Sequence, residues 1–313
     1  MGHAHSHAGH GHHHGPVAYG RAFAIGVTLN LSFVIVEFTF GYLSNSLALI
    51  ADAGHNLSDV LGLLFAWGAA VLATRQPTAR RTYGLRRSSI LAAVANAVLL
   101  LVAVGGIAWE AIQRFGEPGS VAGTTVIWVA AIGCVINTAT ALMFMRGQHN
   151  DINIKGAFLH MAADAAVSLG VVIAGIGINM TGWQWLDPIT SLIIAGVILV
   201  GTWGLLRDSV NLALDGVPAG IDVAAVTSYL QNLPGVTNIH DLHIWGMSTT
   251  ESALTAHLVV TGQHKDPDAL IVMTTQALHD QFGIEHATLQ LETKPRSDCC
   301  SLGQPAVGQL HTY

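Results

Sequence analysis

Two apolar segments of the chain each carry a histidine and an aspartate four residues apart. His55 precedes Asp59 in one segment, and His160 precedes Asp164 in the other. Residues four apart lie on one face of a helix, one turn from each other. If the two faces pack together, two imidazoles and two carboxylates meet, which is the donor set of a tetrahedral Zn²⁺ site. A single pair is equally typical of a hydrogen bond between helices, but the repetition favours a metal site.

The composition places these segments in a membrane protein. Of the 313 residues, 51% are hydrophobic and 10% are charged, against about 25% charged in soluble domains. This composition excludes an ordinary soluble enzyme and intrinsic disorder. A net charge of -6 with only 13 Lys and Arg excludes a nucleic-acid-binding protein.

Long apolar segments are predicted to form six transmembrane helices. They cover residues 21–43, 47–74, 88–113, 122–145, 154–180 and 187–206. Each approaches or exceeds the ~20 residues that a bilayer requires, and none alternates as a barrel strand does. The two His–Asp pairs fall in the second and fifth segments.

The basic residues predict the orientation. With six spans the two termini share one side of the membrane, and of the 13 Lys and Arg only Arg114 falls on the other side. Because Lys and Arg are enriched in cytoplasmic loops, both termini are expected in the cytoplasm and the chain in the inner membrane.

Residues after the last span predict a small α+β domain. Helices are expected at 221–232 and 266–282, and strands at 239–246, 252–260 and 286–292, in the order αββαβ. The expected organisation is a His-rich flexible tail (1–16), a six-helix transmembrane domain (20–206), this cytoplasmic domain (207–295) and a flexible C-terminal tail (296–313).

Histidine is concentrated at the N-terminus. The chain has 17 histidines, and seven of them lie among the first 14 residues. The intervening Gly, Ser and Ala indicate a flexible tail that attracts metal, and an expression tag is the alternative. The cysteines, Cys134, Cys299 and Cys300, imply no disulfide framework.

Other acidic residues also fall within the predicted spans. Glu37 and Glu110 are each interpreted as a proton carrier, a partner of Arg114, or a group hydrated at the interface. Asp52 lies three residues before His55, near the mouth of that span. An interfacial hydrogen bond is its expected role, and attracting or relaying ions is the alternative.

A site made of four protein ligands favours transport over catalysis. Catalytic zinc keeps an open position for water, and the chain has no HExxH motif. A histidine must be neutral to bind metal, so metal and protons compete for it. Exchange of protons for Zn²⁺ at one site is therefore the expected chemistry.

These features resemble the cation diffusion facilitator family of zinc/proton antiporters. The motifs that carry the resemblance are the His-rich tail, SLALIADAGHNLSD at 46–59, YGLRR at 83–87, the second HxxxD, and DGVP followed by HDLHIW. The resemblance covers about residues 20–295. It implies a six-helix fold, a homodimer, a metallochaperone-like (ferredoxin-like) cytoplasmic domain, and a transport site of His55, Asp59, His160 and Asp164. Members with His in both motifs typically prefer zinc.

The resemblance also implies metal sites in the cytoplasmic domain. The matching residues are His240, His257 and Glu292, with a second group formed by His286, Cys299 and Cys300. The alternatives are ordinary polar residues on a sheet and an unbound tail. The chain departs from some relatives at Gln290, where they carry a histidine.

A further site that some relatives hold between spans two and three is expected to be absent. Arg80, Arg81, Arg86 and Arg87 stand there in place of Asp and His ligands. They are expected to contact anionic lipid or to pair with Asp208 or Asp215.

The sequence thus predicts a dimeric exporter, not an enzyme, that moves cytoplasmic Zn²⁺ outward in exchange for protons. Its partners are a second copy of the chain, the bilayer, divalent metal ions and protons. A membrane metal sensor or storage protein is the alternative class, and a preference for Co²⁺, Ni²⁺ or Cd²⁺ is the alternative specificity.

Overall fold

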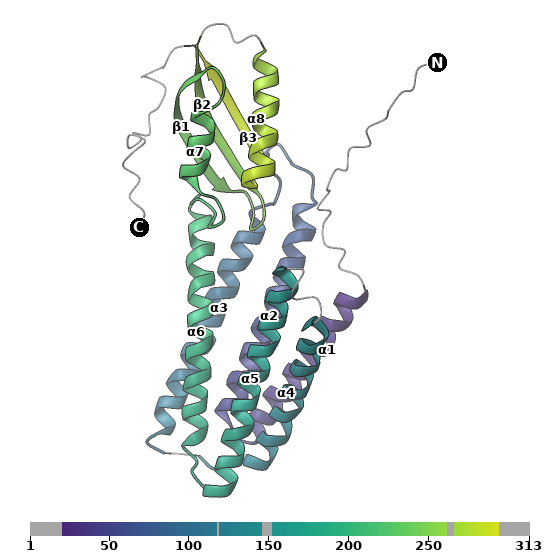
Figure 1. The fold of residues 1–313 in the computed structure, drawn as a ribbon. Coiled ribbons are helices and arrows are strands. Elements are labelled where there is room, and N and C mark those ends of the chain that lie inside the picture. Colours follow the sequence, from purple (N-terminus) through teal and green to yellow (C-terminus); the bar gives the residue numbers. More distant parts are fainter. Residues whose placement is uncertain (1–20, 118, 146–151, 262–265, 294–313) are drawn as a thin grey trace. The chain divides into compact units, whose positions relative to one another are not determined.

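The computed structural model describes residues 21–117, 119–145, 152–261 and 266–293. The elements follow the expected order (Figure 1). They are α1 (Arg21–Leu43), α2 (Leu47–Ala73), α3 (Ser88–Arg114), α4 (Gly123–Met145), α5 (Ile152–Thr181), α6 (Leu186–Ala213), α7 (Val223–Gln231), β1 (Val236–Gly246), β2 (Ser252–Val260), α8 (Pro267–Phe282) and β3 (His286–Glu292). The chain divides into two compact units, Met1–Ala70 with Ile107–Ile194 and Val71–Gly106 with Ala195–Tyr313.

The long helices have the length and composition of membrane spans. Among the described residues, five helices are long and apolar enough to cross a bilayer, namely α2, α3, α4, α5 and α6. The described part of α1 adds a shorter apolar helix, Val27–Leu43. Large apolar side chains such as Val102, Met143 and Met180 are exposed on these helices, as lipid contact requires. The predicted helical membrane architecture is confirmed.

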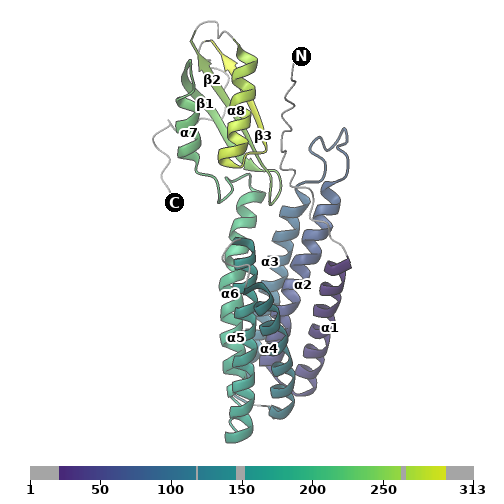
Figure 2. The ribbon, with the colours of Figure 1, turned by 45° about the vertical axis from the view of Figure 1, so that its right-hand side comes forward.

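Glycines bring α4 and α5 close together in the first unit. A Cβ at Gly175 would lie 2.9 Å from Cγ1 of Ile127 and 3.3 Å from the carbonyl oxygen of Gly123. Small residues at such crossings let two helix backbones approach in lipid. The two helices lie side by side in both views (Figures 1 and 2). This contact positions α5, which carries His160 and Asp164.

The α+β domain of the second unit has two layers. The sheet order is β1-β2-β3, with β1 antiparallel and β3 parallel to β2. Helices α7 and α8 cover one face of the sheet (Figures 1 and 2). Buried residues of that face include Leu230 of α7, Leu258 of β2 and Leu278 of α8. The predicted αββαβ fold is confirmed.

Local capping explains where the helices of this domain begin and end. The Asp222 side chain accepts hydrogen bonds from the first backbone N–H groups of α7, and Asp266 does the same for α8. Helix α8 ends at Gly283, whose φ of 65° is the left-handed conformation that glycine adopts readily.

Strand alternation places the polar residues of β2 opposite the helices. Leu254, Ala256 and Leu258 are buried in the core, so His257 points to the other face of the sheet. The register pairs His240 with His257 and His257 with Gln290. Neighbouring strands therefore bring polar side chains together on the open face.

Candidate metal centres

The four residues of the two HxxxD patterns form a connected cluster between α2 and α5. Nε2 of His55 lies 3.0 Å from Oδ1 of Asp164, and Nε2 of His160 lies 3.3 Å from Oδ2 of Asp59. Each imidazole thus faces the carboxylate of the other helix. His160 also lies 3.7 Å from Asp164, and the two imidazole centroids are 6.3 Å apart. The structure brings together all four residues that the sequence singled out.

The cluster is closed on one side and open on the other. The side chain of Asp164 is 3% exposed and that of His55 is 19% exposed, whereas His160 is 45% exposed. Donor atoms of His55, Asp59 and Asp164 lie within 4.8 Å of one another. With neutral imidazoles the four groups carry two negative charges, which a divalent cation neutralises. Uncompensated carboxylates are costly at such a position.

Asp52 is buried between α2 and α5. Its side chain accepts a hydrogen bond of 2.9 Å from the Ser168 hydroxyl of α5, and the residue is 1% exposed. The prediction of a hydrogen bond is confirmed, and the bond joins α2 to α5. Hydropathy locates the end of a span and does not show which face of the helix packs inward.

The alternatives for the other two acids are resolved by their contacts. Glu110 accepts a hydrogen bond of 3.3 Å from Nε of Arg114. Glu37 is fully buried and accepts a hydrogen bond of 2.9 Å from the Asn56 amide of α2. Glu37 is therefore neither hydrated at an interface nor the acid that Arg114 contacts at that distance.

Asp187 holds the beginning of α2 in place. Its carboxylate accepts hydrogen bonds from the backbone N–H groups of Leu47 at 2.7 Å and Ala48 at 3.2 Å, and from the Ser46 hydroxyl. Arg114 lies 4.0 Å away. The sequence does not indicate this role of Asp187, because a cap supplied from another helix leaves no local pattern.

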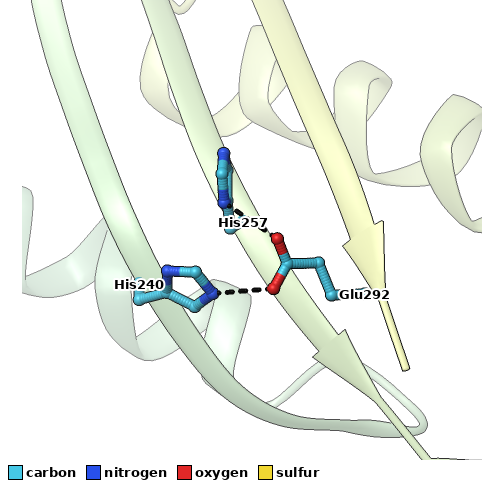
Figure 3. Close-up of side chains that lie close together, drawn as sticks. All are labelled: His240, His257 and Glu292. Carbon is cyan, nitrogen blue, oxygen red and sulfur yellow. Dashed lines mark hydrogen bonds and ion pairs between the residues drawn. The ribbon is translucent and has the colours of Figure 1, made fainter. Parts of the chain in front are cut away.

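The second cluster consists of His240, His257 and Glu292 and lies on the face of the sheet that α7 and α8 leave uncovered (Figure 3). Glu292 lies 3.0 Å from Nε2 of His240 and 3.1 Å from Nδ1 of His257, and the two imidazole centroids are 4.9 Å apart. Donor atoms of these three residues lie within 4.8 Å of one another. The structure therefore places the three implied ligands together.

Hydrogen bonds keep the Glu292 carboxylate charged. Burial opposes ionisation, but hydrogen bonds with His240 and Gln290 outweigh it and lower the pKa of Glu292 below its usual value. The Gln290 side-chain amide donates to Oε1 of Glu292 at 2.8 Å. It orients the carboxylate in this chain.

Two residues next to this cluster, Asp241 and His243, are not singled out by the sequence pattern. Asp241 has a φ of 53° at an irregularity in the β1–β2 register. Its carboxylate lies 3.1 Å from His243 and 3.6 Å from Nε2 of His257. The HDLH stretch carries the signal, but a β-bulge that turns successive side chains to one face is not visible in a strand pattern.

The second implied cytoplasmic group is only partly described. His286 packs its ring against Tyr83 at a centroid distance of 5.9 Å. It stands six residues before Glu292 on β3, roughly 20 Å along an extended strand. Cys299 and Cys300 lie outside the described residues, as do the tails 1–16 and 296–313. This group stays a prediction.

The arginines after α2 contact the cytoplasmic domain within the second unit. Arg87 pairs with Asp215, one of the partners expected for it. Arg86 lies 2.6 Å from Glu251, a partner that the sequence does not indicate.

Comparison with known proteins agrees with these features. Residues 23–212 match the family model of the cation efflux transmembrane domain, and residues 218–294 match that of the cation efflux protein cytoplasmic domain. "Zinc transporter ZitB" of Escherichia coli (strain K12) is 38% identical and is covered, like this chain, over 100% of its length.

Other relatives carry names that refer to several metals. The "Cadmium, cobalt and zinc/H(+)-K(+) antiporter" of Bacillus subtilis (strain 168) is 36% identical over 97% of this chain and 96% of the relative. The "Metal cation efflux system protein CzcD" of Cupriavidus metallidurans is 38% identical over 94% and 90%. The solved "Metal-bound C-terminal domain of the CzcD transporter" is 35% identical over 23% of this chain and 99% of that structure, with a TM-score of 0.21.

Proposed function

Because the chain belongs to the cation diffusion facilitator (cation efflux) family of multi-pass membrane transporters, we propose that it exports cytoplasmic Zn²⁺ in exchange for protons. The transport site is the cluster of His55, Asp59, His160 and Asp164. The observation that carries the proposal is the convergence of two imidazoles and two carboxylates from two apolar helices.

The geometry supports exchange of a cation for protons at one place. The imidazoles that would bind Zn²⁺ each face a carboxylate, which stabilises the protonated imidazole when metal is absent. Metal binding must displace those protons. The His160 side of the cluster is the more exposed one, which favours approach of an ion from that side.

The donor set supports zinc over hard cations. Two imidazoles favour zinc and its neighbours over Mg²⁺ or Ca²⁺, which take oxygen ligands. A preference for Co²⁺, Ni²⁺ or Cd²⁺ is the alternative, and the names of the relatives include cadmium and cobalt.

The setting of the transporter is part of the same proposal. The distribution of Lys and Arg supports an inner-membrane protein with both termini in the cytoplasm. The matched model of the cytoplasmic domain is named ZT_dimer, which supports a homodimer. The boundaries at 16, 20, 206 and 295 stay predictions.

Flux into vesicles tests the exchange. In proteoliposomes loaded at acidic pH and diluted into zinc at neutral pH, an outward proton gradient is expected to accelerate zinc uptake, because protons leave the vesicle as each zinc ion enters. Radioactive zinc trapped in the vesicles measures the rate. The control is the same vesicles with the gradient collapsed by a protonophore. Zinc uptake at the same rate with and without the gradient would contradict the proposal.

We also propose that His240, His257 and Glu292 bind a metal ion on the cytoplasmic side. The support is their convergence on one face of the sheet and the ionised Glu292. Such a site would stabilise the domain in the presence of metal, since a ligand that binds only the folded form shifts the folding equilibrium.

Hydrogen exchange of the full chain tests this accessory site. In an Asp164→Asn background, which disables the transport site, zinc at about 100 times its Kd is expected to slow amide exchange of β2 and β3 by up to about a hundredfold. His257→Ala is expected to remove this protection, whereas His279→Ala, on the exposed surface of α8, leaves it intact. Equal protection in both variants would show that the cluster does not hold the metal.

A further inference from the structure

Two carboxyl groups that are not among the four proposed ligands meet between α1 and α2. The side chains of Glu37 and Asp52 lie within hydrogen-bonding reach of each other. Glu37 is 0% exposed and Asp52 is 1% exposed. Two acids so deeply buried and in mutual contact are not explained by helix packing alone.

The other contacts of the pair leave one oxygen on each acid without a donor. The Asn56 amide donates to Oε2 of Glu37, and the Ser168 hydroxyl donates to Oδ2 of Asp52. Among the described residues, no N–H or O–H group reaches Oε1 of Glu37 or Oδ1 of Asp52. Ionised carboxylates only accept hydrogen bonds, so two of them cannot satisfy each other.

A single proton shared by the two acids resolves this arrangement. It turns one acid into a donor and removes one of two like charges that would otherwise lie together in a low-dielectric interior. We propose that Glu37 and Asp52 share one proton and form a proton-binding site coupled to the metal site. This inference rests on the proposed function, because it names where an exchanged proton is held.

The surrounding groups link the pair to the metal ligands. Asp52 stands one turn before His55 on α2, and its partner Ser168 stands one turn after Asp164 on α5. Besides Glu37 of α1, the ionisable groups that act on Asp52 are His55 of α2 and Asp164 of α5.

The sign of the coupling follows from charge. A divalent cation at the ligands adds positive charge near the pair and favours loss of the shared proton. A proton on the pair in turn disfavours the cation, because coupling between two sites is reciprocal. The pair therefore releases its proton when metal arrives and regains it when metal leaves.

Proton release on zinc binding tests the inference. In Glu37→Gln the side-chain amide donates permanently to Asp52 and imitates the protonated pair. The full-length variant in weakly buffered detergent solution, followed with a pH indicator, is expected to release about one proton fewer per Zn²⁺ than the wild type. Because a protonated pair disfavours the cation, its zinc affinity is expected to fall at least about tenfold, and its zinc flux to lose most of its acceleration by a proton gradient.

Matched variants separate this role from a structural one. Asp52→Asn is expected to show the same loss, and the double variant no further loss, because the two acids share a single proton. Glu110→Gln, which removes an acid paired with Arg114 on α3, is expected to release protons as the wild type does. Proton release by Glu37→Gln equal to that of the wild type overturns the inference.

A measurement on the unaltered protein covers the case in which both variants fail to fold. Zinc binding is expected to remove the infrared C=O band of a protonated carboxylic acid, and a difference spectrum without this loss overturns the inference. The proposed function fails separately. In that case the wild type itself shows no acceleration of zinc flux by the gradient, whatever the variants do.

Discussion

Asp164→Asn is expected to reduce zinc flux at least about a hundredfold, which corresponds to ~2.7 kcal/mol of lost interaction. Asp164 is the proposed ligand that lies close to both imidazoles, at 3.0 Å from His55 and 3.7 Å from His160. The asparagine keeps the shape but removes one of the two negative charges that balance the divalent ion. Its amide N–H group also points a donor at groups that must bind metal.

Uptake by reconstituted vesicles measures this loss, with zinc affinity measured in parallel on detergent-solubilised protein. Asp208→Asn, an exposed acid on α6, serves as the control and is expected to transport normally. The same variant separates the two classes of function. A metal sensor built on the cytoplasmic domain would keep its response in Asp164→Asn, and full flux in this variant would remove Asp164 from the transport site.

Asp187→Ala is expected to destabilise the folded protein by about 3 kcal/mol or more. The change leaves the buried N–H groups of Leu47 and Ala48 without their acceptor, and each unsatisfied group costs roughly 1–3 kcal/mol. It also removes the carboxylate near Arg114. The thermal unfolding midpoint of the detergent-solubilised protein is expected to fall clearly below that of the wild type.

Asp187→Asn provides the matched comparison. Its amide oxygen still accepts from a backbone N–H group, while the charge and the second acceptor are lost, so an intermediate midpoint is expected. If Asp187→Ala unfolds at the wild-type temperature, the bonds to α2 contribute nothing measurable and the anchoring role is wrong.

The sequence predicts the ends of the helices well where a helix ends with its apolar segment, and less well where the helix continues into polar residues. The last span was expected to end at 206, but α6 continues to Ala213. Hydropathy marks where apolar side chains stop, whereas backbone hydrogen bonding continues through polar residues such as Arg207 and Asp208. The first strand likewise begins at Val236 and not at 239.

The same distinction applies to the candidate sites. The HxxxD repeats identify four clustered side chains because a four-residue spacing and a duplicated motif are both local signals. The contact between Glu37 and Asp52 depends on how two helices rotate against each other, and no spacing within either helix encodes it. The burial of Asp52 has the same cause, since a residue near the end of a span is exposed only if its face of the helix is exposed.

Because Asp187 holds the beginning of α2, a tilt of this helix displaces its distant residues more than its near ones. Asp187 fixes it at Leu47, while Asp52 and Asp59 lie five and 12 residues further along, or about 8 Å and 18 Å at 1.5 Å per residue. A rigid tilt of about 10° around the anchored end displaces Asp59 by about 3 Å and Asp52 by about 1 Å. A tilt of this size moves Asp59, a proposed metal ligand, by more than a bond length, and moves Asp52 of the buried acid pair much less.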